Sequence, residues 1–423
     1  MLYSLYESGY YAAAPLRAAA MLARDFWSSP LNPARESEAA RRLYAGADVF
    51  LNLTRRYGRP AWGIDEVLVD GRPVRVRELE VWSSPWCKLT HFSRDQADLR
   101  RAGRRGLEPA VLIVAPLSGH YATLLRGTVA TFLQDHEVFV TEWSNARDVP
   151  LVEGRFDMHD FIDHVREMLR VMGPRPHVVA VCQPGPPTLS AAALMAEDGE
   201  ESRPASMTFM GSPIDARLSP TVTNKLAEER PFAWFESNMI YTVPPPYPGM
   251  GRRVYPGFVQ LASFMSMNLE RHQEAHARYL EHLMAGDGDS ADNHREFYDE
   301  YLSVLDLTEE FYLQTVDVVF QRYLLPKGEL MHRGRPVLPQ RITDIGLLTV
   351  EGENDDISGI GQTQAAHALC SGLPEELKED YVQPKVGHYG VFNGRRFRDE
   401  IYPKVRAFIR RTEPVFDKGR VSA

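Results

Sequence analysis

The 423-residue sequence has few cysteines, no block of basic residues and no metal-binding motif. Its three cysteines, Cys87, Cys182 and Cys370, are odd in number and far apart, which argues against a disulfide framework and favours a cytoplasmic location. The formal charge is -9, and an acidic chain without a basic stretch is a poor candidate for binding nucleic acid. None of the thirteen histidines stands in an H-E-x-x-H or similar cluster, so we expect neither a metal nor another cofactor.

The N-terminal region predicts neither a signal peptide nor a membrane span, because Arg17 and Arg24 interrupt its apolar stretch. The Leu and Ala pattern over residues 16–23 indicates an amphipathic helix. Such a helix either packs on the protein or contacts a hydrophobic surface. We assign residues 1–63 to an N-terminal helical segment.

The rest of the sequence is organised around a strand that ends at a cysteine. Residues 177–181 contain three valines typical of a buried strand, and the Pro/Gly cluster after Cys182 prevents its continuation. A helix is predicted from residue 186 onward. Cys182 therefore lies on a strand-to-helix corner that resembles the nucleophile elbow of α/β-hydrolases. The alternative interpretation is a buried core thiol.

This elbow departs from the G-x-S-x-G pattern of α/β-hydrolases. Ala180 and Pro184 occupy the small flanking positions, and Gly185 comes one residue late. Cysteine also replaces serine.

Strands and helices alternate on both sides of the elbow strand. A hairpin over 67–69 and 74–82 and a strand at 88–92 predict an antiparallel start to the sheet. Further strands are predicted at 110–115, 137–143 and 206–210, with helices at 124–133 and 161–172 between them. This alternation predicts an α/β-hydrolase fold with a doubly wound, mostly parallel sheet, formed by residues 64–213 and 341–423.

The alternation stops between residues 214 and 340, where helices are predicted at 258–284 and 296–323. The simplest interpretation is a helical cap insertion over the active-site face. Its aromatic side chains either belong to a core or line a groove for an apolar chain. Candidate substrate contacts are His120, Trp234, Tyr241 and Phe264.

Two loops beyond the insertion supply candidate partners for the cysteine. A strand at 345–350 precedes Asp355 and Asp356, either of which stands in the position of a triad acid. His388 lies in a glycine-flanked loop before the last predicted helix, at 395–411. The order of nucleophile, acid and histidine is that of the α/β-hydrolases. Backbone amides of Gln183 and Ser118 are the candidate oxyanion donors, Ser118 because it follows the strand at 110–115.

Over nearly its whole length the sequence resembles the intracellular polyhydroxybutyrate (PHB) depolymerases. The matching motifs are P-L-S-G-H-Y at 116–121, V-C-Q-P-G at 181–185, M-G-S-P-I-D at 210–215, N-D-D-I at 354–357 and V-G-H-Y-G at 386–390. The resemblance implies that Cys182 is the nucleophile, Asp355 the acid and His388 the base. It also implies attachment to storage granules in the cytoplasm and activity on amorphous polymer.

We therefore expect hydrolysis of PHB to 3-hydroxybutyrate and oligomers through an acyl-thioester intermediate. The alternatives are a polyhydroxyalkanoate synthase-like acyltransferase and a non-catalytic granule-coat protein. Expected partners are the polymer and the granule surface, with a homo-oligomer possible and with no nucleic acid and no membrane span.

Overall fold

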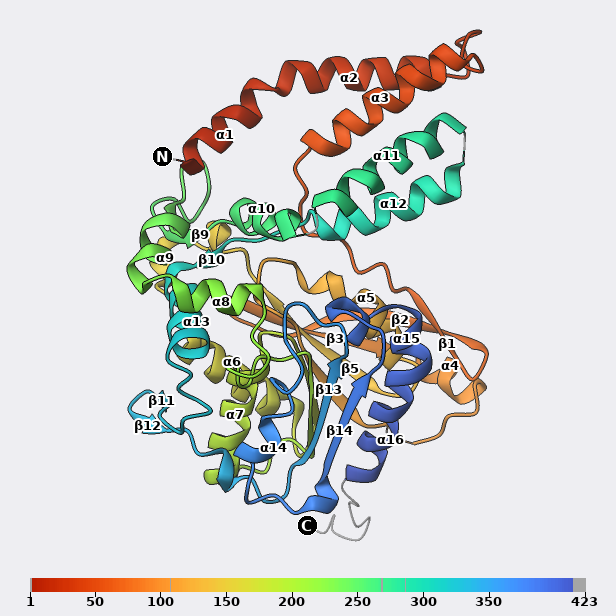
Figure 1. The fold of residues 1–423 in the computed structure, drawn as a ribbon. Helices are drawn as coiled ribbons and strands as arrows, with labels where there is room; N and C mark the ends of the chain where they lie inside the picture. The colour runs from red at the N-terminus through yellow and green to blue at the C-terminus, as the bar shows by residue number, and fades with distance from the viewer. Residues whose placement is uncertain (1, 107, 268, 286, 414–423) are drawn as a thin grey trace.

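The computed structural model describes residues 2–106, 108–267, 269–285 and 287–413, and its centre is a nine-stranded sheet (Figure 1). The strand order is β1-β2-β3-β5-β4-β6-β7-β13-β14. The strands are β1 Glu66–Val69, β2 Arg72–Ser83, β3 Cys87–Arg94, β4 Ala110–Val114, β5 Glu137–Trp143, β6 His177–Val181, β7 Ser206–Met210, β13 Gly346–Gly352 and β14 Lys378–Gln383. The strands from β5 to β14 pair in parallel, whereas β1 to β3 are antiparallel.

Two apolar layers cover the sheet. Alternate residues of β6 face opposite sides, so that Val178 and Ala180 belong to one buried cluster and Val179 and Val181 to the other. The first cluster includes α6, Met158–Met172, and α7, Gly185–Glu197. The second includes α5, Arg126–Phe132, and α16, Tyr402–Thr412. The predicted α/β-hydrolase fold with a doubly wound, mostly parallel sheet is confirmed.

The predicted antiparallel start is also confirmed, because β1 pairs with β2 and β2 with β3 in antiparallel register. Asp70 and Gly71, between β1 and β2, both have positive φ, as a tight two-residue hairpin turn requires. Two elements escaped the sequence pattern. One is helix α4, Gln96–Arg101, which Asp95 caps at its N-terminus. The other is the edge strand β14, which begins with three charged residues and is mostly half-buried, so it lacks the apolar run of the central strands.

The insertion after β7 contains helices and small strands. Its helices are α8 Val222–Glu229, α9 Phe232–Met239, α10 Gly257–Met267, α11 Leu269–Ala285, α12 Gly288–Tyr301 and α13 Glu309–Thr315. β8 Tyr241–Thr242, β9 Arg253–Tyr255 and β10 Leu307–Thr308 form a three-stranded sheet, and β11 Met331–His332 pairs with β12 Arg335–Pro336. The helix predicted at 258–284 corresponds to two helices, α10 and α11. Residue 268, between them, lies outside the described residues.

The single helix predicted at 296–323 is wrong. Helix α12 ends at Tyr301, and after one closing turn the chain bonds to the core from Leu305 onward. The Leu305 N–H donates to the Gly119 carbonyl at 2.7 Å, and the Asp306 N–H donates to Asn145 Oδ1 at 3.0 Å. These long-range hydrogen bonds outweigh the local helical periodicity.

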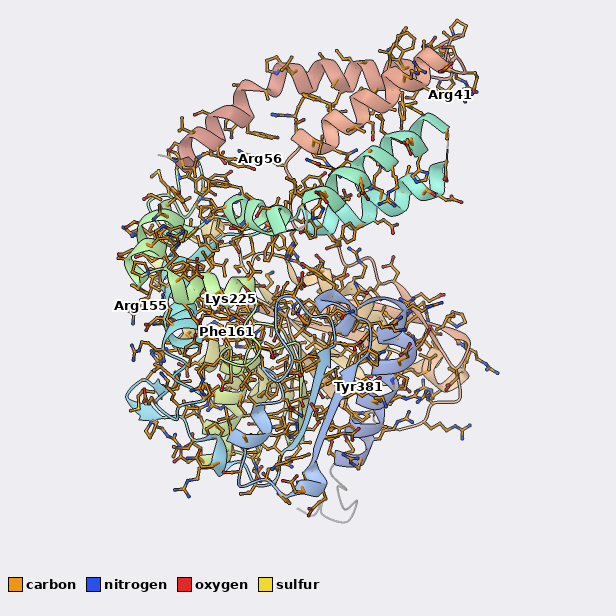
Figure 2. The ribbon with its side chains drawn as sticks, viewed as in Figure 1. Arg41, Arg56, Arg155, Phe161, Lys225 and Tyr381 are labelled. Carbon is orange, nitrogen blue, oxygen red and sulfur yellow. The ribbon has the colours of Figure 1, made fainter. Side chains whose placement is uncertain are left out.

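The N-terminal helices are α1 Leu2–Ala12, α2 Ala14–Ser28 and α3 Glu38–Thr54. In Figure 1 they lie beyond α11 and α12, on the side away from the sheet. Tyr3 anchors α1 through a 2.7 Å hydrogen bond to Asp306. Arg56, labelled in Figure 2, lies on the side that faces the insertion and donates to the Tyr247 hydroxyl at 2.8 Å. Within the described part of the chain, no helix has both the length and the apolar character of a membrane span.

Candidate active site

Cys182 is the first residue after β6 and adopts a left-handed backbone conformation, with φ of +65°. This conformation is uncommon for a residue other than glycine and is the kind of strain that a nucleophile elbow requires. Two hydrogen bonds hold it: the Cys182 N–H donates to the Met210 carbonyl at 2.8 Å, and the Gly185 N–H donates to the Cys182 carbonyl at 3.1 Å. The Cys182 side chain is half-buried.

The glycine that comes one residue late in the elbow motif has a packing role. A Cβ at Gly185 would lie 2.4 Å from the Ser212 Cβ, so α7 can approach the end of β7 only without a side chain there. Gly211, at the same end of β7, has φ of +56°, and a Cβ on it would lie 3.1 Å from His388 Cε1. Both glycines therefore leave room for the elbow and for the histidine.

Asp355, not Asp356, contacts His388. The His388 Nδ1 donates to Asp355 Oδ2 at 2.8 Å, and both side chains are buried. The other carboxylate oxygen of Asp355 accepts the Ile357 and Ser358 N–H groups at 2.9 and 2.8 Å. Asp356 is exposed to solvent. The spacing left open which of the two aspartates lies beside His388, and in the structure it is Asp355.

His388 also interacts with Cys182. Burial by itself lowers the pKa of His388, but the neighbouring Cys182 and Asp355 both favour the charged imidazolium. Their effect outweighs burial and raises the pKa of His388 well above its ordinary value. The structure therefore brings Cys182, Asp355 and His388 together, with Nδ1 held by the carboxylate and Nε2 left for the thiol.

The loop after β4, which contains Ser118, bonds to the elbow through the preceding residue, Leu117. The Leu117 N–H donates to Gln183 Oε1 at 3.3 Å. The Gln183 side chain thus extends from the elbow to the loop after β4 and accepts the Leu117 N–H. Ser118 is half-buried, and no contact joins it to Gln183 in the described residues.

The candidate substrate contacts lie in different environments. His120 and Phe264 meet, with ring centroids 5.5 Å apart. Trp234 is half-buried and packs on Phe235 in a small cluster within the insertion. Tyr241 is also half-buried, and its hydroxyl donates to the Asn238 carbonyl. Within the described residues, no group of three or more His, Cys, Asp or Glu side chains is placed to bind a metal ion.

The sequence analysis missed Glu351, a carboxylate buried in β13. It accepts the Gly361 N–H at 2.8 Å through one oxygen and the Thr363 and Gln364 N–H groups at 2.7 and 3.1 Å through the other. The loop that follows β13 carries Asp355, so Glu351 fixes the far end of that loop. The sequence signal that could have identified Glu351 is its position as an acidic residue directly after the apolar run at 345–350.

We expect Glu351→Gln to lower turnover of a small ester about tenfold or more, because an amide replaces one acceptor oxygen by a donor that faces buried N–H groups. Glu353→Gln is the matched control: Glu353 is exposed in the same turn and accepts only the Lys385 N–H at 2.8 Å. Steady-state kinetics and thermal unfolding of both variants check this. Equal turnover in the two variants would exclude a role for the Glu351 contacts.

Comparison with known proteins gives one family match and a set of similar solved structures. Residues 211–413 match the family model described as "PHB de-polymerase C-terminus". A search of curated proteins finds no match. Similar solved structures include a putative lipase from Acinetobacter baumannii, with 14% identity over 80% of this chain and 92% of that one and a TM-score of 0.39. A thermophilic esterase from Thermogutta terrifontis has 12% identity over 80% of this chain and all of that one, with a TM-score of 0.40.

The matched region begins at Gly211, next to the elbow, and contains the insertion, Asp355 and His388. It therefore covers two of the five motifs on which the sequence resemblance rests, at 354–357 and 386–390, and all but the first residue of a third, at 210–215. Over this region the match bears out the resemblance: residues 211–413, part of a chain with an α/β-hydrolase fold, are similar to the C-terminal region of PHB depolymerases.

Proposed function

We propose that this chain is a carboxylic ester hydrolase that cleaves PHB through a cysteine nucleophile. The observation that carries the proposal is the arrangement of Cys182 on a strained elbow beside His388, which Asp355 in turn orients. A nucleophile, a base within reach and a third group that orients the base form the general pattern of acyl transfer by covalent catalysis. The family match supplies the polyester as substrate class.

The chemistry follows from these atoms. Nε2 of His388 takes the thiol proton of Cys182, and the sulfur attacks the ester carbonyl carbon. Amide N–H groups of Gln183 and of the loop after β4 stabilise the oxyanion. His388 then returns the proton to the leaving hydroxyl, which gives an acyl-thioester. Water, deprotonated by His388, hydrolyses the thioester and restores the thiol.

Burial supports the choice of cysteine. Cys87 and Cys370 are fully buried, whereas Cys182 is partly accessible. Burial raises the pKa of the Cys370 thiol to about 12 and that of Cys87 well above its usual range. Neither buried thiol is suited to ionise and attack an ester at neutral pH.

We expect Cys182→Ala to release less than roughly 1% of the wild-type 3-hydroxybutyrate from amorphous PHB granules, on the scale of losses for triad members. The fold should persist, because a half-buried thiol contributes little packing. Cys87→Ala and Cys370→Ala are the controls and should remain active. Loss of turnover in either control, without unfolding, would place the nucleophile elsewhere, and no 3-hydroxybutyrate from the wild type would favour an acyltransferase or a coat protein.

Asp355→Asn should lower turnover by about 10³-fold or more, because the amide no longer accepts the Nδ1–H and the imidazole loses its orientation. The same change removes a charge that raises the pKa of His388, so the imidazolium should persist over a narrower range, up to a lower pH than in the wild type. Asp356→Asn should be mild because that side chain is exposed. The pH dependence of turnover measures both effects, and reversed severities would assign the acid to Asp356.

We further propose that residues 214–340 act as a cap and that helices α1 and α2 bind the granule. α2 buries none of its residues, and its outer face carries Leu16, Leu22 and Phe26, of which Leu22 is 74% exposed. Arg17 turns back from this face to donate to the Tyr10 carbonyl at 2.8 Å. A face of aliphatic and aromatic side chains suits the surface of an uncharged polyester.

Replacing Leu16, Leu22 and Phe26 together by Ser should reduce co-sedimentation with PHB granules at least tenfold. Turnover of p-nitrophenyl butyrate should stay within twofold of wild type, because a small ester needs no granule surface. A triple variant at Leu68, Leu151 and Val152, exposed apolar residues outside the N-terminal helices, is the control. Unchanged sedimentation would disprove granule binding by this face, and conversion of a dimer to a monomer would identify it as a contact between copies.

A further inference from the structure

A pocket lies where the N-terminal segment, the insertion and the core meet. Its volume is about 140 Å³, and it is lined by Tyr6 of α1, Arg56 after α3, Phe258 and Leu261 of α10, and Arg147 from the loop after β5, among others. Arg56 is labelled at this junction in Figure 2. None of the lining residues belongs to the elbow, the acid loop or the histidine loop. The pocket therefore shares no residue with the candidate active site.

The pocket lining combines apolar and basic side chains. The apolar residues are Leu53, Phe258, Leu261, Leu302 and Val304, and the basic ones are Arg55, Arg56 and Arg147. In sites for small molecules, apolar contacts supply most of the buried area and a few polar groups fix the orientation. A lining of this composition suits a ligand with a short apolar body and a negatively charged group.

Two of the three arginines already bond to carboxylates. Arg55 pairs with Asp299, and Arg56 pairs with Glu7. These ion pairs compensate two of the positive charges, and they leave Arg147 as the guanidinium that can bind an anion. A single guanidinium matches a singly charged carboxylate, whose two oxygens fit its planar fork.

Arg147 itself is mostly buried and poorly paired. Its side chain is 21% exposed, and its one ion pair within the described residues joins Nε to an oxygen of the exposed Asp148 at 3.8 Å. This Nε is buried and makes no hydrogen bond in the described part of the chain. Buried polar groups are normally hydrogen-bonded, so the unpaired N–H calls for a partner. A carboxylate that meets the fork side-on accepts from Nε and one Nη and supplies that partner.

Asp306 is the acidic residue of the pocket lining, and donors already occupy both of its oxygens. Oδ2 accepts the Tyr3 hydroxyl at 2.7 Å, and Oδ1 accepts the Gly257 N–H at 2.8 Å. Burial also raises the pKa of Asp306, in spite of the opposing attraction of Arg147. The two donors and this shift both reduce the repulsion that Asp306 exerts on a bound anion.

We propose that this pocket binds a short-chain carboxylate, with its carboxyl group on Arg147 and its alkyl chain against Phe258 and Leu261. The size agrees, because a cavity of about 150 Å³ accommodates benzene, a molecule about as large as butyrate. Hydrolysis of PHB releases an acid of this class, so the choice of 3-hydroxybutyrate as the ligand rests on the proposed function. The pocket would then bind the product outside the active site.

Isothermal titration calorimetry of the whole wild-type chain tests the site with small probes. We expect butyrate and 3-hydroxybutyrate to bind with a Kd of about 1 mM or below. Butyramide, which lacks the charge, and acetate, which lacks most of the chain, should bind at least tenfold more weakly. Equal affinity for butyramide would overturn the role of the guanidinium, and equal affinity for acetate would overturn that of the apolar lining.

Two further titrations exclude other sources of binding. Alkylation of Cys182 by iodoacetamide places a new group in the candidate active site and should change the Kd of butyrate less than about twofold. Loss of binding after alkylation would show that the acid binds at the triad and would overturn the proposal. The linear dimer of 3-hydroxybutyrate has the same carboxyl end with a longer chain. Equal or tighter binding of this dimer would assign the pocket to the end of a polymer chain instead of the free acid.

Three variants test where the acid binds. Arg147→Gln should weaken butyrate binding at least tenfold, because the amide lacks the charged fork. Leu261→Phe keeps every charge but narrows the pocket, and should weaken binding severalfold even if Arg147→Gln does not fold. The matched control is Arg155→Gln: Arg155, labelled in Figure 2, is 68% exposed and pairs with Asp157 at 3.6 Å. Unchanged affinity in the first two variants, or an equal loss in the control, would overturn the proposal.

Failure of this inference is distinguishable from failure of the proposed function. Binding of butyrate that depends on Arg147 supports the pocket even if the wild type releases no 3-hydroxybutyrate from granules. Release of 3-hydroxybutyrate without any binding of the small acids to the alkylated protein would overturn the pocket and leave the hydrolase in place.

Discussion

The site depends on the left-handed backbone of Cys182. For a residue with a Cβ this conformation costs of the order of 1–3 kcal/mol, so the surrounding structure must compensate for it. Hydrogen bonds from the Cys182 and Gly185 amides and the close approach of α7 to Ser212 supply that compensation. The strain lifts the sulfur above the edge of the sheet, where the loops after β4, β13 and β14 can reach it.

The same edge is kept in register by polar groups that are buried and fully bonded. Glu351 gathers three backbone N–H groups, and Thr363 both donates to the Ser212 carbonyl and accepts the Ser212 N–H. These contacts join the acid loop to the end of β7. Because an unpaired group in this position would be costly, the network favours one arrangement of Asp355 over others. The histidine is therefore oriented by a structure that extends well beyond its own loop.

Much of this could be predicted from the sequence, since the central strands are continuous apolar runs and the elbow is marked by Val-rich residues followed by proline and glycine. The sequence order of Cys182, an aspartate and His388 was also predictable, as was the place of the aspartate in the loop that follows a buried strand. The spacing could not choose between Asp355 and Asp356, because the choice depends on which carboxylate accepts the Ile357 and Ser358 amides. That information is in the turn, not in the pattern.

Other features were beyond local patterns because distant partners determine them. The helix expected across residues 302–306 is replaced by bonds to Gly119 and Asn145, which lie more than 150 residues away. The contact between the Leu117 N–H and the Gln183 side chain joins residues 66 apart in the sequence. The helical period of the apolar residues in α2 predicts an amphipathic helix, but it does not tell whether the apolar face packs on the protein or is exposed to solvent. Only the packed chain decides such cases.

The insertion leaves the sheet after β7 and returns at β13, and these two strands are direct neighbours in parallel pairing. Its two ends therefore meet the core side by side, so its length and internal structure place no demand on strand register. The bond from Tyr3 to Asp306 and that from Arg56 to Tyr247 join the N-terminal segment to the insertion, so a change in the insertion's position would also move the start of α1.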